Sequence, residues 1–305
     1  MPYILRTHHL TKTIGGKNIV TDVNLHVKEG EIYGFLGPNG AGKTTVMKMI
    51  CSLWKPTSGE IEVFGTPLMS DSYEVLKRMG SIIEFPAFYD NITGYQNLKL
   101  HCEYMGYYKH GCIENTLEML GLTEAAGKKV KTYSLGMKER LGIARAILCK
   151  PELLILDEPT NGLDPAGMKQ IRDLLKMLVD EYNTTVLISS HLLSEIESIA
   201  DTIGIIHHGW LRKEISMAEI DQMNFAYIEA KVSNTKQAAF VLSDKMETQN
   251  FKIADNGEIR IYDSKISIPE LAQTFVLNGV EVLALGKKTD TLEDYFLKMT
   301  AEVEK

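Results

Sequence analysis

The chain has 305 residues, which is enough for one large domain and a smaller one beside it. It carries 40 acidic and 33 basic residues, and this acidic balance argues against nucleic-acid binding, which depends on Lys and Arg that neutralise phosphates. It has no apolar run near the roughly 18 residues that cross a bilayer and no secretory signal, so we expect a cytosolic chain. Its four cysteines form no CxxC pair and match no zinc pattern, so we expect unpaired thiols.

Short apolar strands and one glycine-rich loop make up the start of the chain. Residues Tyr3–Leu10 and Val23–Val27 are rich in apolar and β-branched side chains, which predicts two strands. Residues Ile32–Leu36 predict a third strand, and the glycine-rich run follows it directly. Apolar residues at helical spacing predict a helix over Thr44–Leu53, and Ile61–Phe64 predicts a return to strand. A strand, a loop and a helix therefore follow one another without a break.

The middle of the chain is helical between about residues 85 and 140 and then returns to buried strands. The strands predicted at Leu153–Leu156 and Thr185–Ile188 are fully apolar, as in a parallel sheet that is buried on both faces. Alternating strands and helices predict an α/β domain over residues 1–215, with residues 85–140 as a helical insertion. The helices predicted here are Asn97–Met105, Ile113–Leu120, Gly167–Tyr182 and Ser194–Ala200.

Residues 216–305 have a different pattern, which predicts a small α+β domain. Strand, helix, hairpin, helix and strand follow one another, and this βαββαβ order is the ferredoxin-like plan. The segment has no catalytic constellation of residues, so it is a packing or dimer-supporting appendage or, alternatively, a ligand-sensing domain. The predicted elements are Phe225–Val232, Thr235–Met246, a hairpin over Phe251–Tyr262 around Asp255-Asn256-Gly257, Ile268–Asn278, Val280–Ala284 and a last helix, Thr291–Met299.

The glycine-rich run fits the pattern G-x-x-x-x-G-K-[ST], which binds nucleotide phosphates. Its glycines let the backbone wrap a polyphosphate with N–H groups turned inward, and the helix that follows points its positive end at the same anion. Lys43 can reach the β- and γ-phosphates, and the Thr44 hydroxyl can bind Mg²⁺. With Thr45 counted among them, the nucleotide-binding residues of this run are Gly37-Pro38-Asn39-Gly40-Ala41-Gly42-Lys43-Thr44-Thr45.

Two adjacent acids follow the apolar strand at Leu153–Leu156. Side chains at the carboxyl end of a parallel strand face the ligand crevice of an α/β sheet. Asp157 is placed there to hold Mg²⁺ through water, and Glu158 is placed to orient and polarise the attacking water. The alternative is that both are ordinary surface acids, and the presence of Lys43 upstream in the same fold argues against it.

Three further motifs lie downstream of the phosphate loop, and together with it they resemble the ATPase subunits of ABC transporters. The resemblance covers about residues 1–215, and the order and spacing of all the motifs agree with the family. It implies a P-loop NTPase core with an antiparallel β subdomain and a helical insertion, with ATP and Mg²⁺ as cofactors. The three motifs are Ser134-Leu135-Gly136-Met137-Lys138, Asn161-Gly162-Leu163-Asp164 and Ser189-Ser190-His191.

In this family two ATPase domains enclose two ATP molecules between them. The resemblance implies that Ser134 and Gly136 contact the γ-phosphate bound to the partner chain, and that Asp164 belongs to a loop crossing the dimer interface. It also implies that His191 contacts the γ-phosphate as a catalytic switch residue. Without the resemblance, Ser134 reads as a helix N-cap and His191 as a helix-entry residue. We expect a dimer of identical or paralogous chains, bound to a transmembrane permease at the cytoplasmic face of a bacterial membrane.

Two positions depart from the family pattern. Ile14 stands where the family has an aromatic residue that stacks on adenine, so an apolar contact would replace stacking, unless a neighbour such as Tyr3 takes that role. Glu84 stands where the family has a Gln that contacts Mg²⁺. Its carboxylate also offers oxygen to the metal, with an added negative charge, and the alternative is a solvated loop acid.

The second departure indicates a subfamily. The run Ile82-Ile83-Glu84-Phe85-Pro86-Ala87-Phe88-Tyr89 resembles the bacitracin- and lantibiotic-type exporters, as does the run that begins at Ser134. This resemblance implies export of antimicrobial peptides through a separate permease. The alternatives are an exporter ATPase for another cargo, such as a drug, a lipid or an ion, a non-transport ATPase of translation or DNA repair, and a degenerate regulatory nucleotide binder.

Overall fold

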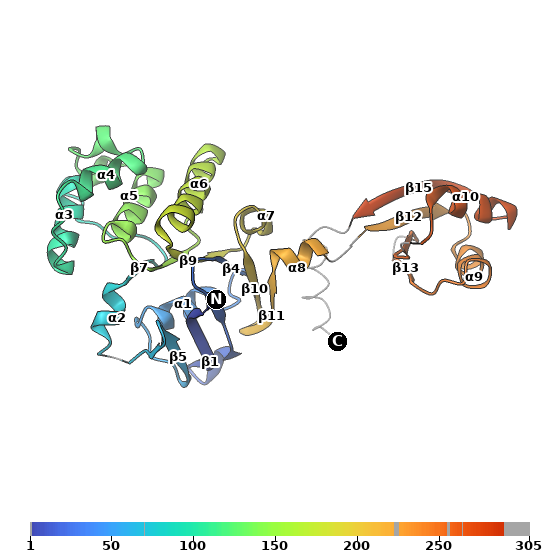
Figure 1. Cartoon of the computed structure of the whole chain (residues 1–305), viewed down its shortest axis with the longest axis horizontal. Coiled ribbons are helices and arrows are strands. Elements are labelled where there is room, and N and C mark those ends of the chain that lie inside the picture. The colour runs from blue at the N-terminus through green and yellow to red at the C-terminus, as the bar shows by residue number, and fades with distance from the viewer. Residues whose placement is uncertain (1, 70, 223–225, 255–256, 264, 290–305) are drawn as a thin grey trace. The chain divides into compact units, whose positions relative to one another are not determined.

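The structure is a computed structural model that describes residues 2–69, 71–222, 226–254, 257–263 and 265–289 (Figure 1). The chain divides into two units, Met1–Ala218 and Glu219–Lys305, and each is described by itself. Within the described ranges, no helix combines the length and the apolar character that crossing a bilayer requires.

A six-stranded sheet forms the centre of the first unit. From one edge to the other its strands are β11 (Trp210–Ser216), β10 (Thr202–His207), β4 (Ile32–Leu36), β9 (Thr185–Ser190), β8 (Leu153–Asp157) and β7 (Met79–Ile82). All neighbours are parallel except β10 and β11, which form an antiparallel pair. Every residue of β4, β8 and β9 is buried, which confirms the parallel sheet with two covered faces that their apolar sequences predict.

Helices cover both faces of this sheet: α1 (Lys43–Ile50) lies on one face, and α6 (Pro165–Tyr182) and α7 (Leu193–Glu197) lie on the other. Tyr33 of β4 is buried in the same core cluster as the apolar residues of α1. Gly34, the next residue, points the opposite way, and a Cβ there would lie 2.2 Å from Cγ2 of Ile196 in α7. Successive residues of β4 therefore face different helical layers, one on each side of the sheet.

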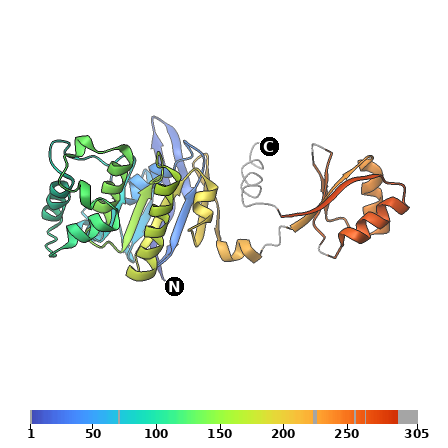
Figure 2. The same cartoon turned by 90° about the horizontal axis from the view of Figure 1, so that it is seen from above.

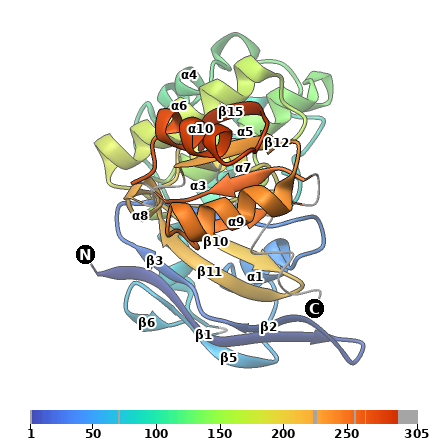
Figure 3. The same cartoon turned by 90° about the vertical axis from the view of Figure 1, so that its right-hand side faces the viewer.

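An antiparallel sheet forms around the long strand β1 (Tyr3–Ile14), which pairs with β2 (Lys17–Val23), β3 (His26–Lys28) and β5 (Ser58–Val63); β6 (Thr66–Pro67) pairs with β5. The single strand expected over Val23–Val27 is wrong. The Asn24 side chain accepts a hydrogen bond from the His9 N–H (2.7 Å), so a side chain replaces the strand ladder between β2 and β3. Figure 3 shows this sheet at the far side of the unit from α4 and α6.

The expected helical insertion lies between β7 and β8, which are neighbouring strands of the six-stranded sheet (Figure 1). Its first long helix begins with a capping box, in which the Thr93 hydroxyl accepts from the Gln96 N–H and the Gln96 side chain accepts from the Thr93 N–H. The insertion contains α3 (Gly94–Met105), α4 (Cys112–Met119), the 3₁₀ turns η1 (Thr123–Ala125) and η2 (Val130–Thr132), and α5 (Leu135–Ile147). The short helix α2 (Tyr73–Lys77) precedes β7 and lies outside the insertion.

The second unit is a four-stranded antiparallel sheet with two helices on one face (Figure 2). Its strands lie in the order β13 (Phe251–Ile253), β14 (Ile259–Ile261), β12 (Ala226–Val232) and β15 (Val282–Thr289), and its helices are α9 (Thr235–Lys245) and α10 (Ile268–Leu277). The short helix α8 (Met217–Gln222) contains the boundary between the units. This is the βαββαβ order of the ferredoxin-like plan. The expected helix Thr291–Met299 and the turn residues Asp255 and Asn256 lie outside the described residues.

Candidate functional site

The glycine-rich run connects the carboxyl end of β4 to the start of α1. Gly42 has a φ of 110°, a backbone conformation that side-chain-bearing residues rarely adopt, and a Cβ at Gly37 would lie 2.4 Å from the carbonyl oxygen of Ile206. The loop closes around Lys43, which is buried and whose Nζ donates to the carbonyl of Gly37 (2.6 Å) and to that of Pro38 (3.3 Å). The first turn of α1 contains no acid, so its positive end is left to an anion.

A hollow of about 180 Å³ lies on this loop. It is lined by Ile19, Glu158 and the run Asn39, Gly40, Ala41, Gly42, Lys43, Thr44 and Thr45. Ile14 is not part of this lining; it pairs with Lys17 beside the hairpin turn of β1 and β2 and is 46% exposed. The structure thus places Ile19, which the motif pattern did not single out, at the wall of the hollow. Only the register of β2 against β1 reveals this position.

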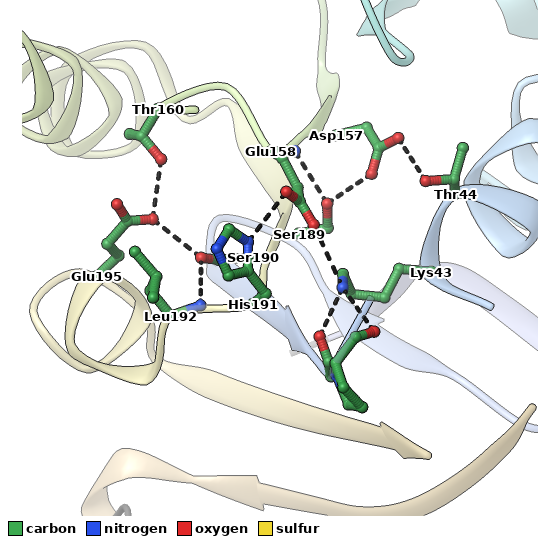
Figure 4. Close-up of polar contacts among 12 residues, drawn as sticks. Lys43, Thr44, Asp157, Glu158, Thr160, Ser189, Ser190, His191, Leu192 and Glu195 are labelled. Carbon is green, nitrogen blue, oxygen red and sulfur yellow. Dashed lines mark hydrogen bonds and ion pairs between the residues drawn. The ribbon is translucent and has the colours of Figure 1, made fainter. Parts of the chain in front are cut away.

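Asp157 joins the ends of three neighbouring strands. It is buried, and its Oδ2 accepts from the Thr44 hydroxyl (2.7 Å) while its Oδ1 accepts from the Ser189 hydroxyl (2.7 Å) (Figure 4). The Ser189 hydroxyl also accepts from the Glu158 N–H (3.0 Å). Because β4, β9 and β8 are adjacent and parallel, these residues meet at one edge of the sheet. Ser189 therefore orients both acids, a role that the sequence analysis did not assign to it.

Glu158 connects the phosphate loop to His191. Its Oε1 lies 3.3 Å from Lys43 Nζ, and its Oε2 forms a hydrogen bond with His191 Nδ1 at 3.0 Å (Figure 4). Its backbone φ is 47°, which is the left-handed conformation that costs a residue with a Cβ about 1 kcal/mol or more. Such strain is concentrated at functional sites, where surrounding contacts hold it in place. The three side chains form a continuous polar chain across the site.

A second polar network holds the loops that carry Glu158 and His191. Glu195 of α7 accepts from the Thr160 hydroxyl (2.8 Å) and from the Ser190 hydroxyl (2.9 Å), and Ser190 Oγ accepts from the Leu192 N–H (2.9 Å) (Figure 4). Thr160 follows β8, and Ser190 ends β9. Glu195 thereby ties together the two loops that follow these strands. No sequence motif marks Glu195, because its contact with Thr160 joins segments 35 residues apart.

Glu84 lies apart from the other expected metal ligands. Its Oε1 accepts from Lys48 Nζ at 2.8 Å, and its side chain is 58% exposed. Its φ of 60° is again left-handed. Thr44 and Asp157 are therefore in contact with each other. Glu84 instead pairs with Lys48, which lies one turn after Thr44 in α1.

Ser134 and Asp164 each cap a helix. The Ser134 hydroxyl accepts from the Met137 N–H (3.2 Å) at the start of α5, and Asp164 Oδ1 accepts from the Gly167 N–H (3.0 Å) at the start of α6. The two helix starts are close to each other: a Cβ at Gly136 would lie 3.2 Å from Leu163 Cδ2, and Leu135 Cδ2 approaches Gly162 in the same way. None of these residues lines the hollow on the phosphate loop of the same chain.

Comparisons with known proteins identify the family of the chain. The family model described as ABC transporter matches residues 20–161. The ABC transporter ATP-binding protein YcbN of Bacillus subtilis (strain 168) is 54% identical, covering 98% of this chain and 97% of YcbN. The bacitracin transport ATP-binding protein BcrA of Bacillus licheniformis is 46% identical, covering 98% of each chain. The lantibiotic transport ATP-binding protein SrtF of Streptococcus pyogenes is 42% identical, covering 68% of this chain and 88% of SrtF.

A solved dimeric structure of a bacterial ABC transporter cassette has the same fold. It is 26% identical, with a TM-score of 0.64, and the match covers 70% of this chain and 98% of that one. The covered share is the size of the first unit, which contains the phosphate loop, both acids and His191. The chain therefore belongs to the ATP-binding proteins of ABC transporters and is an ATP-hydrolysing subunit of that family.

Proposed function

We propose that this chain powers the export of antimicrobial peptides of the bacitracin or lantibiotic kind through a separate transmembrane permease. The observation that carries the hydrolytic part is the polar chain Lys43–Glu158–His191 on the phosphate loop. The likeness to a bacitracin transport ATP-binding protein over nearly the whole chain supports the cargo. The same likeness supports a location at the cytoplasmic face of a bacterial membrane, where the permease would be bound.

Hydrolysis needs the triphosphate to be held and a water to be aimed at it. In this proposal the N–H groups of the loop and the Lys43 ammonium bind the β- and γ-phosphates. Glu158 accepts a proton or hydrogen bond from the attacking water, and its contact with His191 fixes its orientation. His191 can in turn contact the γ-phosphate, since it lies beside the carboxylate that orients the water.

The donor set fits Mg²⁺. Thr44 and Asp157 supply a hydroxyl and a buried carboxylate in contact at 2.7 Å, and oxygen ligands of this kind suit a hard cation. Among the described residues, no group of three or more His, Cys, Asp or Glu could hold a metal by itself. Mg²⁺ in nucleotide sites needs only one or two protein ligands, and when bound it neutralises charge that develops on the phosphates. Glu84 is left out of this proposal because its carboxylate pairs with Lys48.

The proposal includes a dimer that encloses ATP between two chains, identical or paralogous. Ser134 and Gly136 lie at a helix start, which suits contact with an anion, and neither lines the hollow of its own chain. A second chain would bring these residues, and the loop of Asp164, to the γ-phosphate. Adenine would rest on apolar side chains of the β1–β2 hairpin, Ile19 with Ile14.

Replacing Glu158 with Gln tests the hydrolytic assignment. We expect ATP turnover to fall by more than about 100-fold, while ATP binding and ATP-dependent dimerisation persist. The matched control is Glu152→Gln, since Glu152 stands just before β8 and Glu158 just after it, and Glu152 pairs with Arg78 far from the loop. Unchanged turnover in the Glu158→Gln protein would remove Glu158 from the catalytic role.

The cargo is tested separately in the host cell. Deleting the gene should sensitise cells to bacitracin or to a lantibiotic, and a plasmid copy carrying Glu158→Gln should not restore resistance. Purification of the chain from membranes, followed by mass spectrometry of what accompanies it, should identify one multispan permease. Sensitisation to a drug only, with unchanged response to peptides, would assign another cargo while leaving the ATPase assignment intact.

A further inference from the structure

A second cavity, of about 190 Å³, lies at the opposite end of the strands from the phosphate loop. Pro151 and Thr184, which line it, stand just before β8 and β9, whereas the acids and His191 follow those strands. The rest of the wall comes from α4, from the last turns of α5 and α6, and from the segment before α4. The cavity is therefore distinct from the nucleotide site.

The floor of this cavity is apolar. Ile147, Leu148 and Leu178 line it and are each buried to more than nine-tenths. The two hydroxyls at the floor are already used within the chain, since Thr184 donates to the Pro151 carbonyl (3.3 Å) and Thr116 to the Cys112 carbonyl (2.7 Å). An apolar protein cavity of about 150 Å³ is large enough to bind benzene. This floor therefore suits an apolar group of about six to eight carbon atoms.

The rim of the cavity is cationic. Lys109, His110 and Lys150 are exposed at it, and the Lys150 ammonium lies 5.1 Å from the centre of the Tyr182 ring, which is also on the rim. None of the described residues that line the cavity is acidic, although the chain as a whole has a net charge of -7. Among the described residues, neither lysine has a carboxylate partner. The rim thus offers positive charge that the protein itself does not neutralise.

The start of α4 adds no open anion site. Glu114 lies in its first turn, and the Cys112 N–H donates to the Lys109 carbonyl (3.3 Å). The positive charge at the cavity therefore comes from the side chains of its rim. The rim points to an anionic group, and the floor determines what the rest of that ligand must be.

We propose that this cavity binds a small monoanion with an apolar body, of the chemical class of medium-chain carboxylates. The apolar body lies on Ile147, Leu148 and Leu178, and the carboxylate faces Lys109 and Lys150. The site contacts the far ends of α5 and α6, the two helices that begin at Ser134 and Asp164. Nothing in this assignment depends on the identity of the transported cargo or on ATP turnover.

The test uses octanoate as the probe and the purified full-length chain. Calorimetric titration should give a Kd of about 1 mM or tighter for octanoate, and weaker binding of the uncharged 1-octanol. The double variant Lys109→Gln with Lys150→Gln should bind octanoate about tenfold more weakly or worse. The matched control is Lys128→Gln with Lys129→Gln, two exposed lysines outside the cavity in the same insertion, and it should bind like the unchanged protein.

A photoreactive octanoate analogue locates the site. We expect crosslinks in the peptides around residues 109–119, 147–151 and 178–184, with loss of the crosslinks when unlabelled octanoate is present. A Kd for octanoate weaker than about 1 mM overturns the proposal. Equal affinity of the two double variants, or crosslinks confined to other peptides, also overturns it, and thermal unfolding of each variant shows that the fold is kept.

Discussion

The two sets of expected ATP-contacting residues differ in what holds them. Lys43, Glu158 and His191 form one polar chain, and Asp157 is linked to Thr44 and, through Ser189, to the Glu158 N–H, so one chain fixes their geometry. Ser134 and Gly136, by contrast, stand at a helix start, where Ser134 caps the helix and Gly136 lies beside Leu163 of the neighbouring loop. The first set is preorganised within the fold. The second set stabilises a helix start and, in the proposed dimer, would also contact ATP on a partner chain, and these two roles can be separated by substitution.

The largest effect is expected at the centre of the bonded set. Lys43→Ala removes the ammonium around which the loop closes, so ATP affinity should fall by more than about 100-fold and turnover should be lost. Equilibrium binding of a fluorescent ATP analogue measures this. Lys48→Ala, one turn further along α1, serves as the control, because its ammonium pairs with the exposed Glu84 and not with the loop. Equal loss in both variants would indicate damage to α1 rather than loss of a phosphate contact.

A smaller effect is expected from the residue that positions the two acids. Ser189→Ala removes the donor to Asp157 and the acceptor for the Glu158 N–H, so turnover should fall about 10- to 100-fold. Because Asp157 would then be less well fixed, the Mg²⁺ concentration for half-maximal activity should rise. Titration of activity with Mg²⁺ measures both changes. If turnover fell while the Mg²⁺ requirement stayed unchanged, Ser189 would act by positioning Glu158 and not Asp157.

The helix that begins at Ser134 carries a pH-dependent effect. Burial raises the pKa of Glu139 to about 7. Since this pKa is above that of an unfolded glutamate, the folded chain binds more protons between about pH 4.5 and 7, and the unfolding free energy falls as pH rises through this window. In Glu139→Gln, the unfolding free energy should fall by about 2 kcal/mol less over this window than in the unchanged protein. The variant should therefore be the more stable of the two above pH 7.

Thermal unfolding at pH 5 and pH 8 measures this difference for Glu139→Gln. The control is Glu118→Gln, an exposed residue of α4, which should change neither midpoint. A Glu139→Gln variant with the same pH slope as the unchanged chain would show that another group titrates.

The smallest effect on stability separates the two roles of Ser134. Ser134→Ala should cost about 1 kcal/mol through loss of the helix cap, whereas Ser134→Asp keeps a good cap. If Ser134 faces a phosphate on the partner chain, the added negative charge of Ser134→Asp should still abolish turnover. Denaturant unfolding and ATPase assays on both variants measure the two quantities. Full activity of Ser134→Asp would leave Ser134 as a cap only.

The sequence predicted this site unevenly, for physical reasons. The phosphate loop and the strand ending in Asp157 are local patterns, so their placement followed from composition and spacing alone. The roles of Ser189 and Glu195 depend on which strands are neighbours, and the wall position of Ile19 depends on the register of a hairpin. The error at Val23–Val27 has the same origin, since the bond from His9 to Asn24 joins β1 to the break between β2 and β3.

The left-handed backbone of Glu158 has a consequence for the way this chain can change under selection. Asn and Gly adopt this conformation with less strain than Glu, so either residue at this position should make the folded chain more stable. Each would also remove the carboxylate between Lys43 and His191. A library sorted for heat resistance alone would therefore enrich robust but inactive chains, because stability and turnover make opposite demands on one residue.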